Sequence, residues 1–411
     1  MNKIIKDKIK KLKPSATLAI NEECNRLEKS GKKIYKFGFG QSPFPIPDSI
    51  ISALKNNANK HNYLPMQGLE ELRLAAADHI NKFNNNHFEK ENIVIGPGTK
   101  ELMFLIQIAF KGEIILPAPS WVSYQPQALI GENKVYWIET TSDSNWFPTA
   151  KMLEDKIKKI KSKNILFFIN SPNNPSGTVC KNLEEITKVA RKYKIVIFSD
   201  EIYSQLTFNN KYKSISNFYP EGTIVSTGLS KWCGAGGWRL GFVAIPNQLK
   251  EIRDSLKILC SESFTSVSAP IQYAAVEAYK GDHSVYLESV RKILSFIGNY
   301  VYEKLKSNLI SVTKPEGGFY LFLEFVNAKF SSSSEMCQDI LKNTGVALLP
   351  GSDFGLDGKK MLARLSYTDF SGKDFLQHTA SSKKLDEADL KKYAPNIVNG
   401  VIALKEWSNS L

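Results

Sequence analysis

Two stretches decide the fold: Asn164-Ile-Leu-Phe-Phe-Ile-Asn-Ser-Pro-Asn-Asn-Pro-Ser-Gly177 and Lys194-Ile-Val-Ile-Phe-Ser-Asp-Glu-Ile-Tyr203. Each begins with a short, uninterrupted apolar run and continues into polar residues, with prolines in the first. Runs of this length without alternation are typical of strands buried on both faces, as in parallel sheets. Such sheets bind ligands at the carboxyl ends of their strands. The polar residues that follow the two runs are therefore predicted to line a ligand site.

The pattern continues on both sides of these stretches. Further strands are predicted at 113–116, 134–138, 223–226 and 240–245, and helices at 98–110, 182–192 and 248–259. Strands that alternate with helices predict an α/β protein with a mostly parallel sheet covered on both faces. After residue 281 a long helix pattern at 283–308 and the run Gly317-Gly-Phe-Tyr-Leu-Phe-Leu323 indicate a second, smaller α+β unit. The boundary is predicted near residue 285.

Composition excludes several classes of protein. The 411 residues are 42% hydrophobic, which suffices for a large core, and no apolar run approaches the ~18 residues of a membrane span. The net charge is +13, but 47 of the 54 basic residues are lysines scattered along the chain, and only seven are arginines. Scattered lysines do not form a focused phosphate-binding patch, so nucleic-acid binding is not expected. Each retained arginine is instead a candidate for two-pronged oxyanion binding.

Cysteines and histidines give no sign of a metal centre. The five cysteines are odd in number and contain no Cys-x-x-Cys, and the five histidines show no ligand spacing. We therefore expect no metal and a reducing compartment, most simply the cytoplasm. The segment Met1 to Lys13 has no central apolar block, so it is interpreted as a surface helix or arm and not as a secretory signal.

A third segment, Ser230-Lys-Trp-Cys-Gly-Ala-Gly-Gly-Trp-Arg-Leu-Gly241, also follows a predicted strand. A single lysine is usually a solvated surface group, but Lys231 lies among glycines that let backbone approach a ligand closely. Arg239, eight residues later, is one of the few arginines. The segment does not fit a dinucleotide-binding fingerprint or a phosphate-binding P-loop. In the second stretch Asp200 emerges beside a buried sheet, where an unpaired charge is costly, so it requires a cationic partner.

Together, in this order and spacing, the three segments resemble the class I/II pyridoxal-phosphate aminotransferases of the aspartate aminotransferase superfamily. The resemblance extends from Lys13-Pro-Ser-Ala-Thr17 to Arg364-Leu-Ser-Tyr367. It implies an aspartate-aminotransferase-like fold, with a large domain (46–285) around a mostly parallel seven-stranded sheet. The smaller α+β domain would comprise 1–45 and 286–411. It also implies a homodimer with shared active sites.

The resemblance assigns residues to pyridoxal 5'-phosphate. Lys231 is expected to bond to the cofactor aldehyde and to move a proton in catalysis, and Asp200 to pair with the ring nitrogen. Tyr203 is expected to bond the ring 3'-oxygen. The other residues assigned to the cofactor are Asn174 (3'-oxygen), Trp121 (ring face), and Arg239, Ser230, Gly98, Thr99 and the partner-reaching Tyr63 (phosphate).

The resemblance also assigns residues to the substrate. Arg364 is expected to hold the α-carboxylate of an L-amino acid, with Gly40, Asn174 and Trp121 beside it. Lys100, in Gly98-Thr-Lys-Glu101, matches a lysine that binds a second carboxylate in one bacterial branch, which favours aspartate or glutamate as donor and a 2-oxo acid such as 2-oxoglutarate as acceptor. Alternatively, Lys100 is an ordinary helix-surface lysine.

Other functions remain open on the same scaffold. They are transfer from aromatic or other neutral amino acids, pyridoxal-phosphate C–S lyase or decarboxylase chemistry, and a non-catalytic regulator, which is disfavoured because the resemblance already begins at Lys13. Two departures from the family pattern bear on this choice. Gly228 stands where relatives place a Ser or Thr against the phosphate, and Gly40-Gln-Ser-Pro-Phe44 replaces a commoner loop. The sequence does not identify the substrate pair.

Overall fold

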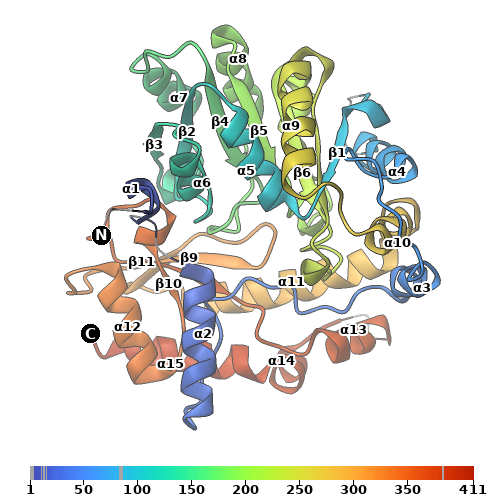
Figure 1. The fold of residues 1–411 in the computed structure, drawn as a ribbon. Helices are drawn as coiled ribbons and strands as arrows, with labels where there is room; N and C mark the ends of the chain where they lie inside the picture. Colours follow the sequence, from blue (N-terminus) through green and yellow to red (C-terminus); the bar gives the residue numbers. More distant parts are fainter. Residues whose placement is uncertain (1–3, 11, 13, 15, 83–86, 382–383) are drawn as a thin grey trace.

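The computed structural model describes residues 4–10, 12, 14, 16–82, 87–381 and 384–411. Two sheets organise these residues. The larger one is surrounded by helices, and the smaller one lies against the edge at which its parallel strands end (Figure 1). Of the helices in the described ranges, none is both long and apolar enough to span a bilayer.

The larger sheet has the strand order β1-β7-β6-β5-β4-β2-β3, and only β7 runs against its neighbours. Its strands are β1 (Ile93–Gly96), β2 (Glu113–Ala118), β3 (Val135–Glu139), β4 (Ile165–Asn170), β5 (Val196–Asp200), β6 (Thr223–Gly228) and β7 (Gly241–Ala244). This confirms the mostly parallel sheet. The residue pattern did not predict β1, because only three apolar residues precede the Gly-Pro-Gly turn at 96–98.

Helices cover both faces of this sheet, as predicted. In β4, the side chains of Leu166 and Phe168 pack in one cluster, and those of Ile165, Phe167 and Ile169 in another. The first cluster includes α5 (Thr99–Ala109), α6 (Tyr124–Ile130) and α9 (Lys250–Ser263). The opposite face is covered by α7 (Ala150–Ile157), α8 (Leu183–Tyr193), α4 (Glu70–Asn81) and α10 (Ala269–Lys280). Burial on both faces explains why β4 is an unbroken apolar run.

The smaller sheet is antiparallel, with the order β10-β11-β9-β8. Its strands are β8 (Ile310–Val312), β9 (Tyr320–Phe325), β10 (Leu349–Pro350) and β11 (Leu362–Ser366). The helices of this part are α2 (Ala16–Lys29), α11 (Ser284–Leu305), α12 (Ser333–Thr344), α13 (Gly372–Ser381), α14 (Glu387–Tyr393) and α15 (Pro395–Asn409). Helix α11 matches the helix expected at 283–308 and buries one face that includes Ile293 and Ile297. The smaller α+β part is therefore confirmed, whereas its boundary stays a prediction.

Most of the described residues before α2 are exposed. A short helix, α1 (Asp7–Lys10), follows Ile4 and Ile5, whose side chains are 90% and 50% exposed. Residues 1–3, 11, 13 and 15 of the predicted arm lie outside the described residues. Helix α3 (Asp48–Asn56) follows the connection into the larger part and packs on α10.

Candidate active site

A cavity of about 470 Å³ lies where the strands of the larger sheet end against the smaller sheet. Its lining includes most of the residues predicted from the sequence: Gly40, Thr99, Lys100, Trp121, Asn174, Asp200, Tyr203, Ser230, Lys231, Arg239 and Arg364. Thr17, Leu18, Phe39, Gln41 and Tyr320 complete much of the remaining wall. Residues from about 17 to 364 thus meet in one place, and the site forms at the carboxyl edge of the sheet, as parallel sheets favour.

Lys231 follows β6 and its ammonium lies inside the protein. Its Nζ donates a hydrogen bond of 2.8 Å to the carbonyl oxygen of Gly40, and lies 5.7 Å from the ring centroids of Tyr203 and Phe319. Burial, together with the nearby Arg364 cation, lowers the pKa of Lys231 to about 8. A sizeable fraction of this amine is therefore neutral near pH 7, as a nucleophile requires.

Asp200 is the last residue of β5 and is 4% exposed. Its carboxylate accepts hydrogen bonds from the Tyr124 hydroxyl (2.6 Å) and the Ile202 amide (3.3 Å). Burial raises the pKa of Asp200 to about 6 despite these bonds. Among the described residues no cation forms an ion pair with this carboxylate. The nearby charge of Lys231 still lowers the pKa of Asp200, without an ion pair between the two.

Arg239 stands at the beginning of helix α5. Its guanidinium donates to the carbonyl oxygens of Gly236 (2.9 Å) and Pro97 (3.4 Å), and no described carboxylate pairs with it. Gly98 precedes the helix with φ +86°, and a Cβ there would lie 2.3 Å from Arg239 Nη2. No side chain caps α5, so its first amides face the same place. An arginine beside a helix N-terminus suits a phosphate.

Arg364, in β11, is 1% exposed, and neither of the two hydrogen bonds that its guanidinium donates goes to a carboxylate. Its Nη1 donates to Asn174 Oδ1 (2.9 Å) and its Nη2 to the Gly38 carbonyl (2.6 Å), while Nε has no hydrogen-bond partner. Burial lowers the pKa of Arg364. A guanidinium that keeps N–H donors unused beside a cavity is suited to a carboxylate.

The loop after β4 places Asn174 in this arrangement. The side-chain oxygen of Asn170 accepts from the Asn174 amide (2.7 Å), while the Asn170 side-chain nitrogen donates to the Asp200 carbonyl (2.8 Å). Asn170 therefore joins the ends of β4 and β5, which explains why an Asn–Pro loop follows this strand.

Trp121 and Lys100 form the outer wall. The Trp121 ring lies edge-on to Tyr124, with centroids 5.4 Å apart, and Lys100 Nζ lies 5.6 Å from the centroid of Trp121. Partial burial and the neighbouring Arg239 cation lower the pKa of Lys100. Because Lys100 remains solvent-accessible, this cation can meet a ligand at the mouth of the cavity.

Two sequence-based assignments differ from the rest. Tyr63 does not line the cavity of its own chain and is 89% exposed, so a single chain does not bring it to the site. At Gly228, a Cβ would lie 2.8 Å from the Cα of Gly241 in the paired strand β7, which leaves no room for the Ser or Thr of relatives.

Sequence reasoning missed two tyrosines. Tyr124 binds Asp200, and its only signal was its place three residues after Trp121, beyond the end of β2. Tyr320 contacts Tyr203 through the hydroxyl groups, 2.9 Å apart, and lies under Arg364. No motif marked Tyr320, because its contacts come from residues more than 40 positions away in the chain.

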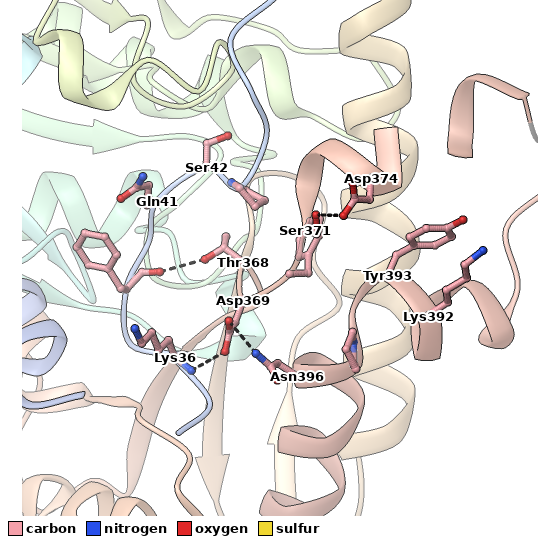
Figure 2. A pocket seen from close by; sticks show the side chains of 14 residues that line it. Lys36, Gln41, Ser42, Thr368, Asp369, Ser371, Asp374, Lys392, Tyr393 and Asn396 are labelled. Carbon is pink, nitrogen blue, oxygen red and sulfur yellow. Dashed lines mark hydrogen bonds between the residues drawn. The ribbon is translucent and has the colours of Figure 1, made fainter. Parts of the chain in front are cut away.

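A second cavity, of about 450 Å³, lies behind the segment that carries Gly40 (Figure 2). Phe39 and Gln41 line both cavities. On this far side Thr368 Oγ1 donates to the Phe39 carbonyl (3.1 Å), and Asp369 accepts from the Lys36 amide (2.9 Å) and from Asn396 (3.2 Å). These bonds hold the segment around Gly40, whose carbonyl oxygen accepts the hydrogen bond from Lys231.

Comparisons with known proteins agree with this geometry. Residues 32–372 match the family model of aminotransferase class I and II. The chain is 33% identical to an aspartate aminotransferase of Bacillus sp. (strain YM-2), over 86% of this chain and 93% of the relative.

Solved structures show the same fold. The aspartate aminotransferase of Thermus thermophilus with maleate superposes with a TM-score of 0.82 at 26% identity, covering 92% of this chain and 98% of that one. Alanine aminotransferase from Pyrococcus furiosus reaches 0.85 at 26% identity, covering 99% and 100%. The protein is therefore an aminotransferase of the class I and II family.

Proposed function

We propose that the protein uses pyridoxal 5'-phosphate to move an amino group between an L-amino acid, with aspartate or glutamate favoured, and a 2-oxo acid such as 2-oxoglutarate. The single observation that carries this proposal is the meeting of Lys231 and Arg364 in one cavity. One supplies a buried amine, and the other a buried guanidinium with an unused donor.

The residues present fit the cofactor. Arg239, Ser230 and the first amides of α5 would hold its phosphate, Asp200 would pair with its ring nitrogen, and Trp121 would cover one face of the ring. Asp200 is a buried carboxylate that makes no ion pair in the described chain, which suits a protonated ring nitrogen. When bound, this cofactor supplies an electron sink for the carbanion formed at the substrate Cα.

The chain's own groups perform the proton transfers. Lys231 Nζ is an amine with a lowered pKa of about 8, which would suit it to take a proton from the substrate Cα and to give it up again in the cavity. Tyr203 and Asn174 would form hydrogen bonds with the 3'-oxygen of the cofactor ring. Arg364 fixes the α-carboxylate, and with it the orientation of the Cα–H bond toward the lysine.

The amino-acid side chain would point toward Lys100. A distal carboxylate gains from this cation, whose lowered pKa indicates that it is incompletely solvated. The exposed Tyr63 would reach the cofactor phosphate of a partner subunit, so we propose a homodimer with shared active sites. A cytoplasmic location is proposed because the five free cysteines of the described chain fit a reducing compartment.

A single-turnover experiment tests the proposal. The holoenzyme is given each amino acid alone, without an oxo acid, and absorbance and products are followed. An aminotransferase leaves the amino form of the cofactor with one equivalent of 2-oxo acid, whereas a C–S lyase returns to the aldehyde form and releases pyruvate, ammonia and a thiol. A screen against 2-oxoglutarate, pyruvate and oxaloacetate then ranks the acceptors.

A neutral donor is the second candidate. Leu18, Met103 and Ile202 make part of the wall apolar, and the alanine aminotransferase from Pyrococcus furiosus has the same fold. Higher kcat/KM for alanine or phenylalanine than for aspartate and glutamate would favour this alternative.

A further inference from the structure

Tyr320 lies at the point where the two walls of the cavity meet. It is the first residue of β9, and its side chain is 1% exposed. Its hydroxyl oxygen is 2.9 Å from that of Tyr203, and the Arg364 guanidinium carbon lies 4.7 Å from the centroid of its ring. One side chain therefore contacts both the proposed cofactor-binding phenol and the proposed carboxylate-binding cation.

The register of the smaller sheet explains this double contact. In the pairing of β9 with β11, Tyr320 lies opposite Ser366, and Phe322 lies opposite Arg364. Side chains two residues apart in a strand point to the same face, so Tyr320 and Arg364 project together toward the larger sheet.

Close packing fixes the Tyr320 hydroxyl. A Cβ at Gly40 would lie 2.0 Å from Tyr320 Oη, so the hydroxyl rests directly against the backbone of Gly40. The carbonyl of the same glycine accepts the hydrogen bond from Lys231. Because the Tyr320 ring is enclosed by Gly40 and Arg364, it has little freedom to leave Tyr203.

The position of Arg364 indicates which phenol donates this hydrogen bond. The two hydroxyl oxygens lie 2.9 Å apart, and either of them can donate. The Arg364 cation lies over the Tyr320 ring and opposes the rise in the pKa of Tyr320 that burial causes. A phenol under a cation is the better donor, so we take Tyr320 as the donor, which leaves the Tyr203 O–H available to a ligand in the cavity.

We propose that Tyr320 is a positioning residue that directs the Tyr203 hydroxyl into the cavity by hydrogen bonding and holds the Arg364 guanidinium on the face of its ring. The inference rests on the proposed function, in which Tyr203 binds the cofactor ring oxygen and Arg364 the substrate carboxylate. Tyr320 itself need touch neither ligand.

Tyr320→Phe removes the hydroxyl and keeps the ring. Without this donor Tyr203 becomes a weaker donor, so an anionic ring oxygen is less stabilised and its protonated state is favoured. We expect the pH midpoint of the holoenzyme's visible absorbance to rise by ~0.2 to 0.6 unit. An unchanged midpoint would refute the proposed hydrogen-bond role.

The charged and titratable groups around Tyr203 are Asp200, Lys231, Arg364, Tyr124 and Tyr320. All but the last are the same in every variant, so the comparison isolates Tyr320. In a Tyr203→Phe background, Tyr320→Phe should cause no further shift, because the phenol through which it acts is gone. A shift of equal size in that background would mean that Tyr320 acts by a general structural effect.

Tyr367 provides a matched control. It is a fully buried tyrosine beside the same sheet, and its hydroxyl contacts only the Gly318 carbonyl, at 3.4 Å, among the hydrogen bonds of the described chain. Tyr367→Phe should lower thermal stability by an amount similar to Tyr320→Phe and leave the absorbance midpoint in place. Equal midpoint shifts in both variants would contradict the proposal.

The role of the Tyr320 ring in holding Arg364 is tested separately. Calorimetry measures the binding of maleate, an unreactive dicarboxylate, to the holoenzyme. Tyr320→Phe should change its Kd less than twofold, whereas Tyr320→Leu, which removes the ring under Arg364, should raise it about 3- to 10-fold. Equal effects would show that the ring does not hold the guanidinium. Circular dichroism establishes that the leucine variant is folded, and the phenylalanine variant alone decides the hydrogen-bond role.

Failure of this inference can be told from failure of the proposed function. If wild-type protein neither binds pyridoxal phosphate nor yields its amino form, the proposed function is wrong. If wild type does both and Tyr320→Phe leaves the midpoint unchanged, only the inference about Tyr320 is wrong.

Discussion

The two walls of the cavity are built in different ways. The wall from the larger sheet consists of residues that directly follow parallel strands, namely Asn174 after β4, Asp200 at the end of β5, and Lys231 after β6. The wall from the smaller sheet consists of Arg364 and Tyr320, which lie within antiparallel strands. Short motifs therefore encode the first wall, whereas strand register creates the second.

The two walls also differ in chemistry. The larger-sheet wall contains groups whose pKa values lie near neutrality, at about 6 for Asp200 and about 8 for Lys231. On the other wall the Arg364 guanidinium stays charged, because arginine cannot be deprotonated in proteins. In the proposed function, proton transfer would belong to one wall and substrate fixation to the other. This division can be tested by changing one wall at a time.

The largest effect is expected from Lys231→Ala. No other described lysine lines the cavity except Lys100, at its mouth, so loss of the buried amine should abolish turnover and covalent attachment of the cofactor. Borohydride reduction followed by mass spectrometry checks the attachment. A reducible adduct retained in the variant would show that a different lysine serves this role.

Asp200→Ala should lower kcat by several orders of magnitude while pyridoxal phosphate still binds through Arg239. The ring nitrogen would lose its stabilising carboxylate, and the electron sink weakens with it. Cofactor content and kcat are measured on the same sample. Turnover within tenfold of wild type, about 1.4 kcal/mol, would contradict the assigned role.

Lys100→Ala tests the mouth of the cavity, where the two walls meet the solvent. We expect KM for aspartate or glutamate to rise ~10- to 100-fold, equivalent to ~1.4 to 2.8 kcal/mol, because the distal carboxylate loses its cation. The kinetic constants for alanine and phenylalanine should not change, since these substrates carry no second charge. Steady-state kinetics with both donor types check this, and equal losses would assign Lys100 to structure or cofactor binding.

The smallest effect is expected from Tyr124→Phe. The Tyr124 hydroxyl donates to Asp200 and lowers its pKa, so its removal should raise that pKa above about 6. A carboxylate with a raised pKa loses its charge at a higher pH. The pH below which cofactor binding weakens should therefore rise by ~0.5 to 1 pH unit, and the Kd of the cofactor measured across a pH series checks this. If that pH does not change, cofactor affinity does not depend on the charge of Asp200.

The sequence by itself determined the class of fold and the larger-sheet wall. Unbroken apolar runs such as 165–169 favour strands buried on both faces, and the polar residues that follow such strands emerge at one edge of the sheet. The ordered motifs around Asn174, Asp200 and Lys231 therefore identify this wall from local sequence alone. The strand Ile93–Gly96 was not predicted, because a run of four residues is too short to show a clear periodicity.

Only the tertiary structure decided the contacts that cross the cavity. The bonds of Tyr203 to Tyr320 and of Asn174 to Arg364 join residues 117 and 190 positions apart. Local sequence does not encode such pairs, because they depend on how two sheets face each other and on the register of β9 with β11. Burial is likewise a property of the assembled fold, and burial shifts the pKa values of Asp200 and Lys231 toward neutrality.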